Sequence, residues 1–95
     1  MYARVTTIQI EPAKLPELVA KLGEFKANAK GLKGVINTYA VWRADGHCVV
    51  TSIYTDKASA DAAMVNAQAT LAGLASAFKG MPKIETYDSV EHLSG

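Results

Sequence analysis

The sequence predicts an α+β fold in which four antiparallel strands and two helices follow the order βαββαβ. Three observations support this prediction. Residues 33–56 are typical of a β-hairpin, because Asp45-Gly46 is a two-residue turn signal between β-branched and apolar segments. Residues 2–10 and 83–90 are also rich in strand-forming residues. Between these strands, apolar residues recur three and four positions apart, as they do along a helix with one buried face.

The first strand is expected to alternate between two faces, with Thr6 on the same face as Arg4 and Ile8. The first helix follows it, with Pro16 in the first turn, where a missing N–H costs little, and it is expected to end near Gly31. The apolar stripe of this helix consists of Leu15, Leu18, Val19, Leu22, Phe25 and Ala29. The pattern predicts an amphipathic helix that buries one face in the core.

The second helix is longer and rich in alanine, which favours helix formation. Asp56 is the expected N-cap, with Ser59 as the alternative. Gly80 and Pro82 are expected to end the helix, and the fourth strand then covers residues 83–90. The stripe predicted to face the sheet consists of Ala60, Ala63, Met64, Ala67, Leu71, Leu74, Ala75 and Phe78. Two helices cover only one face of a four-stranded sheet, and the predicted order of elements is ferredoxin-like.

The register of the hairpin follows from the two-residue loop, which places Trp42 opposite Val49 and Thr38 opposite Ile53. One predicted face carries Ile36, Thr38, Ala40, Trp42, Val49, Thr51 and Ile53. The other carries Asn37, Tyr39, Val41, Arg43, Cys48, Val50, Ser52 and Tyr54. Both faces hold apolar or aromatic side chains, so the pattern leaves open which of them the helices cover. The uncovered face needs a partner, and we therefore predict a homodimer joined sheet to sheet.

Length and composition exclude several classes of protein. We expect 95 residues to form a single domain, residues 1–95. A net charge of +1 gives no electrostatic reason to expect nucleic acid or a membrane as a partner. The chain starts without the pattern of a signal peptide and has no apolar run long enough to span a bilayer, so we expect a cytoplasmic protein. Its single cysteine, Cys48, is expected to be a buried apolar residue.

From Tyr2 to about Leu93 the chain resembles the antibiotic biosynthesis monooxygenase-like domains of the dimeric α/β-barrel superfamily. The resemblance lies in the opening strand with EPAKLPEL after it, in Gly34 before the hairpin, and in the segments IYTDKASADAA and PKIETYDSV. It implies a homodimer in which two sheets pack face to face. It also implies a small cavity in each subunit between the sheet and the helices.

The activities of this family differ widely. Some members oxidise polycyclic aromatic compounds with molecular oxygen and no metal or flavin, others act on quinols, and others degrade haem. The haem-degrading branch uses an asparagine on the first strand, where this chain has Thr6, together with a tryptophan and a histidine on the second helix. Residues 57–79 contain neither of these two residue types. We therefore expect no haem, and no metal or other cofactor.

Candidate site residues come from the strands. The only histidines, His47 and His92, lie far apart in the sequence and are not spaced as metal ligands. Polar and aromatic residues on one predicted hairpin face suggest chemistry instead, and we predict catalytic roles for Asn37, Tyr39 and Tyr54. An amide and two phenols could stabilise an enolate-like anion of a phenolic substrate, which would itself react with oxygen. The alternative is that these side chains only pack across the strands.

Two further residues are predicted to bind substrate. Thr6 aligns nearest the family's strand-one asparagine, and Trp42 could stack on a ligand or pack against the core or a dimer partner. We therefore predict a cofactor-independent monooxygenase that acts on a small aromatic or quinone-type compound. The alternative is a non-catalytic dimer that binds a small molecule or acts in a stress response.

Overall fold

The computed structural model describes residues 1–29 and 31–94, with only the backbone described at residues 28 and 29. The elements are β1 (Tyr2–Gln9), the 3-10 helix η1 (Pro12–Lys14), α1 (Leu15–Ala20), α2 (Leu22–Ala29), β2 (Val35–Trp42), β3 (His47–Tyr54), α3 (Lys57–Leu74), the 3-10 helix η2 (Ala75–Ala77) and β4 (Lys83–Tyr87). The predicted α+β fold with ferredoxin-like order is confirmed.

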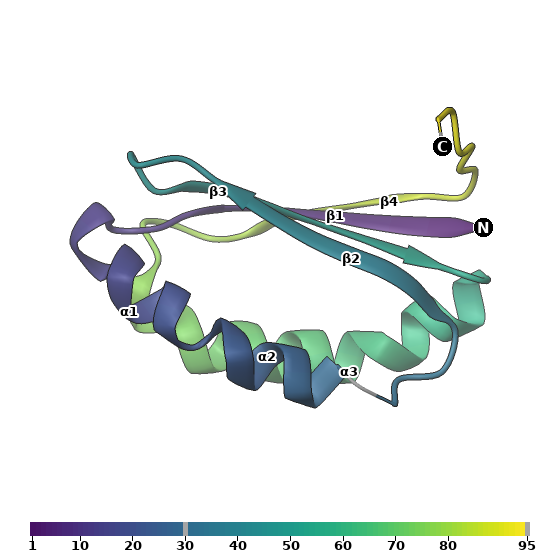
Figure 1. The fold of residues 1–95 in the computed structure, drawn as a ribbon, viewed down its shortest axis with the longest axis horizontal. Helices are drawn as coiled ribbons and strands as arrows, with labels where there is room; N and C mark the ends of the chain where they lie inside the picture. The colour runs from purple at the N-terminus through teal and green to yellow at the C-terminus, as the bar shows by residue number, and fades with distance from the viewer. Residues whose placement is uncertain (30, 95) are drawn as a thin grey trace.

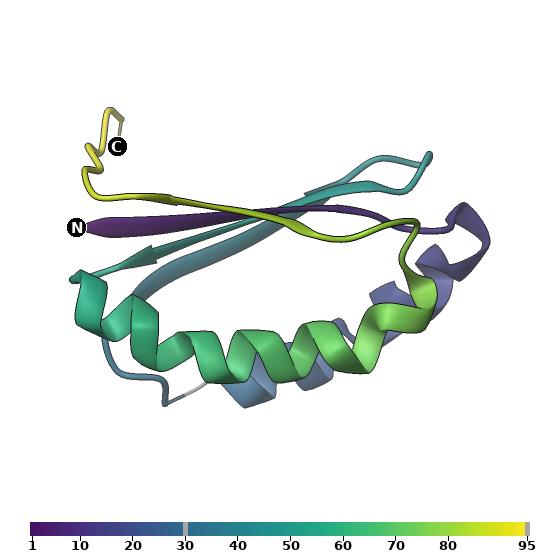
Figure 2. The same ribbon diagram turned by 180° about the vertical axis from the view of Figure 1, so that it is seen from behind.

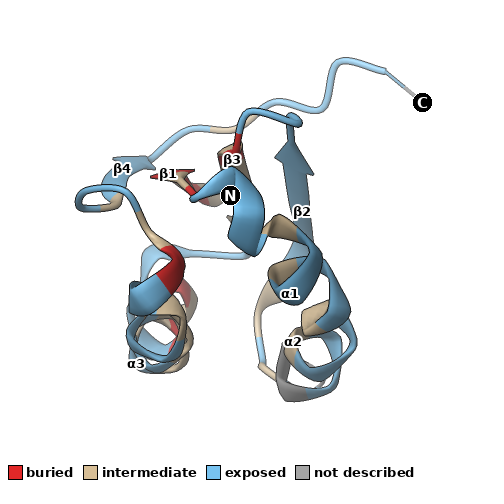
Figure 3. Ribbon diagram, turned by 90° about the vertical axis from the view of Figure 1, so that its left-hand side faces the viewer, coloured by how far each residue is buried: buried red, intermediate tan, exposed pale blue. Residues whose placement is uncertain are grey.

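The four strands form one sheet in the order β2-β3-β1-β4, and every neighbouring pair is antiparallel. All helices lie on one side of this sheet, as Figures 1 and 2 show from opposite directions. Seen along the strands, α3 lies below β1 and β4, whereas α1 and α2 lie below β2 (Figure 3). The sheet therefore has a helix-covered face and an open face.

The register of the hairpin differs from the prediction by one residue. Its loop has three residues rather than two, because the Gly46 amide donates to the Arg43 carbonyl at 2.9 Å and the Arg43 amide to the His47 carbonyl at 2.9 Å. Gly46 adopts the left-handed φ of 91° that such a loop requires at this position. Trp42 consequently lies opposite Cys48 rather than Val49.

This shift decides which residues share a face. A one-residue change of register moves every side chain of one strand to the other side relative to its partner. Tyr54 lies on the helix-covered face with Cys48, whereas Tyr39 and Asn37 lie on the open face, opposite Thr51 and Ile53. The predicted common face for Asn37, Tyr39 and Tyr54 is therefore wrong.

The helices begin as predicted but differ in length. Asp56 is the N-cap of α3, and its carboxylate accepts a hydrogen bond from the Ser59 amide at 2.8 Å. The helix ends at Leu74, six residues before Gly80, and continues as η2. The first predicted helix is divided into α1 and α2 at Lys21, where the backbone forms a turn.

The core is small and lies in two places between the sheet and the helices. One cluster contains Ile8, Ile10, Cys48 and Ala77, and the other contains Tyr54, Ala60 and Ala63. The alanines of α3 allow the helix to approach the sheet closely.

The accessible surface of the chain is 6331 Å², which is larger than the value of about 5,300 Å² expected for a compact monomer of this mass. Within residues 1–29 and 31–94, no helix is both long and apolar enough to cross a membrane.

Candidate functional site

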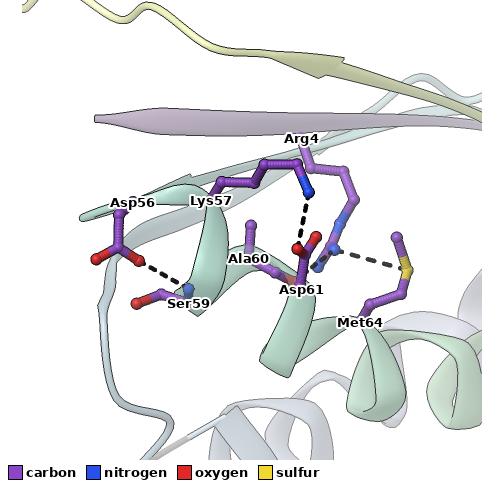
Figure 4. Close-up of polar contacts among 7 residues, drawn as sticks. All are labelled: Arg4, Asp56, Lys57, Ser59, Ala60, Asp61 and Met64. Atoms are coloured by element: carbon purple, nitrogen blue, oxygen red, sulfur yellow. Dashed lines mark hydrogen bonds and ion pairs between the residues drawn. The ribbon is translucent and has the colours of Figure 1, made fainter.

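A buried arginine is the most unusual feature of the helix-covered face. Arg4 projects from β1 towards α3 and is only 6% exposed. Its guanidinium donates to the Ala60 carbonyl at 3.2 Å and contacts the Met64 sulfur at 3.6 Å (Figure 4). It also donates to the Tyr54 hydroxyl and lies 5.1 Å from the centre of the Tyr54 ring. Arg4 therefore joins β1, β3 and α3 through one polar cluster.

No carboxylate balances the charge of Arg4 within the part of the chain that the structure describes. The five ion pairs found there involve other residues, and all of them lie at the exposed surface. The acceptors around Arg4 are a carbonyl, a phenol and a thioether, which are all uncharged. Removing a cation from water without a counter-ion costs several kcal/mol, so this arrangement is expensive for a core of this size.

Other polar groups lie beside Arg4 on the same face. Ser52 is its cross-strand partner on β3, and Thr6, two residues further along β1, is only 8% exposed. Arg4, Ser52 and Thr6 form a polar region between the core cluster of Ile8 and that of Tyr54. Hydroxyl and guanidinium groups arranged in this way can donate several hydrogen bonds to an oxygen anion.

A cleft of about 270 Å³ lies between α2 and α3. Its walls combine an aromatic ring, small apolar side chains and polar groups, contributed by Lys21, Glu24, Phe25, Asn66, Ala69, Thr70, Gly73 and Leu74. The Thr70 hydroxyl donates to the Asn66 carbonyl at 3.0 Å, within the same helix. A second hollow, between α1 and the end of α3, measures only about 20 Å³, which is room for a single water molecule. Of these two hollows, the first is large enough for an organic ligand.

The predicted site residues do not meet in one place. Tyr54 is 2% exposed and Thr6 8% exposed, both beneath the helices, whereas Tyr39 is 64% exposed on the open face. Asn37 is exposed beside Tyr39 on that face. Trp42 lies on the helix-covered face but is 43% exposed, because β2 is the edge strand there. The catalytic roles predicted for Asn37, Tyr39 and Tyr54 remain predictions, but a common cavity wall for all three is excluded by the register.

Arg4 was the residue that sequence reasoning missed. Its signal was present, since a charged residue alternates with Thr6 and Ile8 on the face of the first strand that packs into the core. Charged residues are rarely fully buried unless something pairs with them, so such a position marks a candidate site. Cys48 is buried as predicted, and its burial raises the pKa of the thiol.

No metal-binding group stands out in the described part of the chain, where no three side chains of histidine, cysteine, aspartate or glutamate gather in one place. His47 begins β3, and His92 lies exposed in the segment after β4.

No protein-family model and no curated protein matches the chain. Solved structures do match it in fold. A protein of unknown function from Nitrosomonas europaea has a TM-score of 0.78 and 20% identity, covering 99% of this chain and 95% of its own. A protein from Caulobacter crescentus that is named as an antibiotic biosynthesis monooxygenase has a TM-score of 0.81 and 22% identity. The match covers 95% of this chain and 90% of that protein.

A third match is a variant of MhuD with two manganese protoporphyrin molecules bound in each active site, at a TM-score of 0.75 and 15% identity over the whole of both chains. These similarities confirm the fold predicted from the resemblance. The fold of this chain is that of the antibiotic biosynthesis monooxygenase-like proteins.

Proposed function

We propose that the protein is a cofactor-independent monooxygenase that oxidises a small aromatic or quinone-type compound. The observation that carries this proposal is the cleft between α2 and α3, in a fold shared with proteins named as monooxygenases. A volume of about 270 Å³ lies just below the range of about 300–1,000 Å³ typical of ligand pockets. It suits a compound of two or three fused rings.

The side chains of the cleft match such a ligand. Phe25 offers an aromatic surface for stacking, and Ala69 and Gly73 leave room beside it. The Asn66 amide lies in the same wall and can donate to a ligand oxygen. The cleft therefore combines apolar surface for a ring system with polar and charged groups that can bind its oxygens.

The reaction needs no reductant if the substrate itself supplies the electrons. A ring methylene beside a phenol, ionised to its anion, combines with molecular oxygen. One oxygen atom becomes a carbonyl oxygen on that carbon, the other leaves as water, and the two C–H bonds that break provide the electrons. The role of the protein is to bind the anion, stabilise its charge and hold the reacting carbon where oxygen can reach it.

Oxygen consumption with a panel of hydroxyquinones, quinols and ring-methylene phenols tests this function. The expected result is stoichiometric oxygen uptake with at least one class, unchanged after treatment with a metal chelator. Ala69→Trp should fill the cleft and abolish uptake, whereas Gln68→Trp, at an exposed position of the same helix that does not line the cleft, should not. Uptake that is absent throughout the panel, or that survives Ala69→Trp, would contradict the proposal.

A second candidate is a protein that binds such a compound without converting it. It is favoured by the observation that none of the three residues predicted to be catalytic, Asn37, Tyr39 and Tyr54, lines the cleft. In that case the panel shows binding that Ala69→Trp removes, but no oxygen uptake with any compound.

We infer further that the active form is a homodimer joined through the open face of the sheet. Tyr39 and Val41 are 64% and 62% exposed at the β2 edge of that face, and Tyr87 is 47% exposed on β4. Residues 88–94 rise on the same side of the sheet, and Leu93 among them is 92% exposed (Figures 1 and 2). Apolar groups this exposed support a contact with a second copy of the chain, related by a two-fold axis.

A further inference from the structure

We propose that Arg4 makes the protein selective for a ligand bound as an anion, an acidic hydroxyquinone or phenol whose charged oxygen pairs with the guanidinium. This inference rests on the proposed function, because it assumes that the ligand is a small aromatic compound that binds on the helix-covered side of the sheet. It adds the charge state of that ligand and the residue that recognises it.

The first argument is the charge balance around Arg4. Its guanidinium is 6% exposed, and the part of the chain that the structure describes places no carboxylate within 4.0 Å of it. The acceptors that it does have, the Ala60 carbonyl and the Tyr54 hydroxyl, carry no charge. Guanidinium groups stay protonated in proteins, so the charge cannot be removed by losing a proton.

The second argument is the position of Arg4 in the fold. A second copy docked on the open face would lie on the far side of the sheet, because Arg4 points towards α3. Such a partner could not supply the missing carboxylate. A small anionic ligand bound between the sheet and the helices would supply this charge.

The third argument is that the surroundings of Arg4 leave hydrogen-bonding capacity for a ligand. Tyr54 accepts from the guanidinium and so keeps its own O–H free to donate in another direction. The contact with Met64 is to a sulfur, which is a weak acceptor on a flexible side chain that an anionic oxygen can displace.

Binding of lawsone, an acidic hydroxynaphthoquinone, and of its methyl ether tests the proposal directly. The two compounds share one ring system, but only lawsone ionises. Titration calorimetry at about pH 7 should show that the wild-type protein binds lawsone about 10- to 100-fold more tightly than the ether, as expected for a hydrogen-bonded charge. Arg4→Met should reduce this preference to about twofold or less, whereas Arg43→Met, at an exposed arginine of the hairpin loop, should leave it unchanged.

Equal affinities in the wild type, including no binding of either compound, would overturn the proposal, and so would a preference that survives in Arg4→Met. A second measurement covers the case in which Arg4→Met does not fold. The chain has only two arginines, so protein labelled on arginine nitrogen gives two guanidinium signals. Lawsone should shift the Arg4 signal and not that of Arg43, and the ether should shift neither; an unmoved Arg4 signal contradicts the inference.

The outcomes also separate this inference from the proposed function. Equal binding of both compounds, blocked by Ala69→Trp, would preserve the cleft as the ligand site and reject the role of Arg4. An Arg4-dependent preference without oxygen uptake in the panel would preserve the anion site and reject the monooxygenase.

Discussion

Tyr54 and Tyr39 lie on neighbouring strands of one hairpin, yet the first is 2% exposed and the second 64%. Tyr54 packs under Ala60 and Ala63 of α3 and accepts a hydrogen bond from Arg4. Tyr39 projects from the open face and has Thr51 as its cross-strand neighbour. The same residue type thus stabilises the subunit on one face of the sheet and is available for a partner on the other.

The comparison shows that burial here does not follow polarity. Arg4 and Thr6 are buried on the helix-covered face, whereas Val41 and Tyr39 are exposed on the open face. Soluble monomers usually have the opposite distribution. Buried polar groups and exposed apolar groups are compatible if a polar ligand binds on the helix-covered face and a second subunit binds on the open face.

The largest effect is expected from Tyr54→Ala, which removes a fully buried ring and the phenol beside Arg4. The free energy of unfolding should fall by about 3–5 kcal/mol. Urea denaturation should show the same loss at every protein concentration, because the contacts lie within one subunit. Tyr39→Ala is the matched control, and its effect should appear mainly at low protein concentration, where dimers dissociate. A Tyr39 effect equal to that of Tyr54 at all concentrations would break the contrast between the faces.

Val41→Asp tests the open face alone. Val41 is 62% exposed in the subunit, so a charge there should leave the subunit folded but weaken dimerisation roughly 100-fold, about 3 kcal/mol, since the carboxylate would be buried against the partner. Sedimentation equilibrium measures the change. Val65→Asp, on the exposed side of α3, is the control and should remain dimeric. The predicted register placed Ala40 on one face with Trp42 and Thr51. In the structure Ala40 lies opposite Val50 on the helix-covered face. Ala40→Asp therefore does not test the contact between two subunits.

Gly46→Ala tests the hairpin turn, which determines which side chains of β2 and β3 lie on the helix-covered face and which on the open face. A Cβ at Gly46 would meet the Ile10 carbonyl, and its φ of 91° disfavours any other residue. The expected loss in the free energy of unfolding is about 1–3 kcal/mol. Gly80→Ala, with a φ of 87° but nothing near the added Cβ, isolates the backbone strain and should cost less. Equal losses would show that the close approach of Gly46 to the Ile10 carbonyl is unimportant.

The smallest effect is expected from Asp56, which caps the helix that covers Arg4 and Tyr54. The Ser59 amide and hydroxyl hold the pKa of this carboxyl below its usual value of about 3.9. Because the folded-state pKa is the lower one, the cap stabilises the fold above about pH 4 and this contribution is lost as the pH falls through the folded pKa. Thermal unfolding should show Asp56→Ala below the wild type near neutral pH and close to it in acid. Asp56→Asn keeps an oxygen for the cap, and its melting temperature relative to Asp56→Ala should not change with pH in this range.

The sequence by itself determined the order of strands and helices, the cap at Asp56 and the burial of Cys48. These depend on local patterns: alternation in strands, spacings of three and four in helices, and side chains that bond the nearest backbone amide. Which residues share a face of the hairpin was decided by one additional loop residue. Two- and three-residue loops fit the same Asp45-Gly46 signal, and they differ only in whether Arg43 and His47 pair across the loop.

The candidate site was decided by tertiary structure for the same reason. Arg4 could be identified as a charged residue in a core strand, but its lack of a counter-ion depends on what α3 and β3 place around it. The cleft depends on the separation of α2 and α3, which are 28 residues apart in sequence between Ala29 and Lys57. Local patterns specify which face of an element is apolar, whereas the distance between two elements depends on the packing of all the side chains between them.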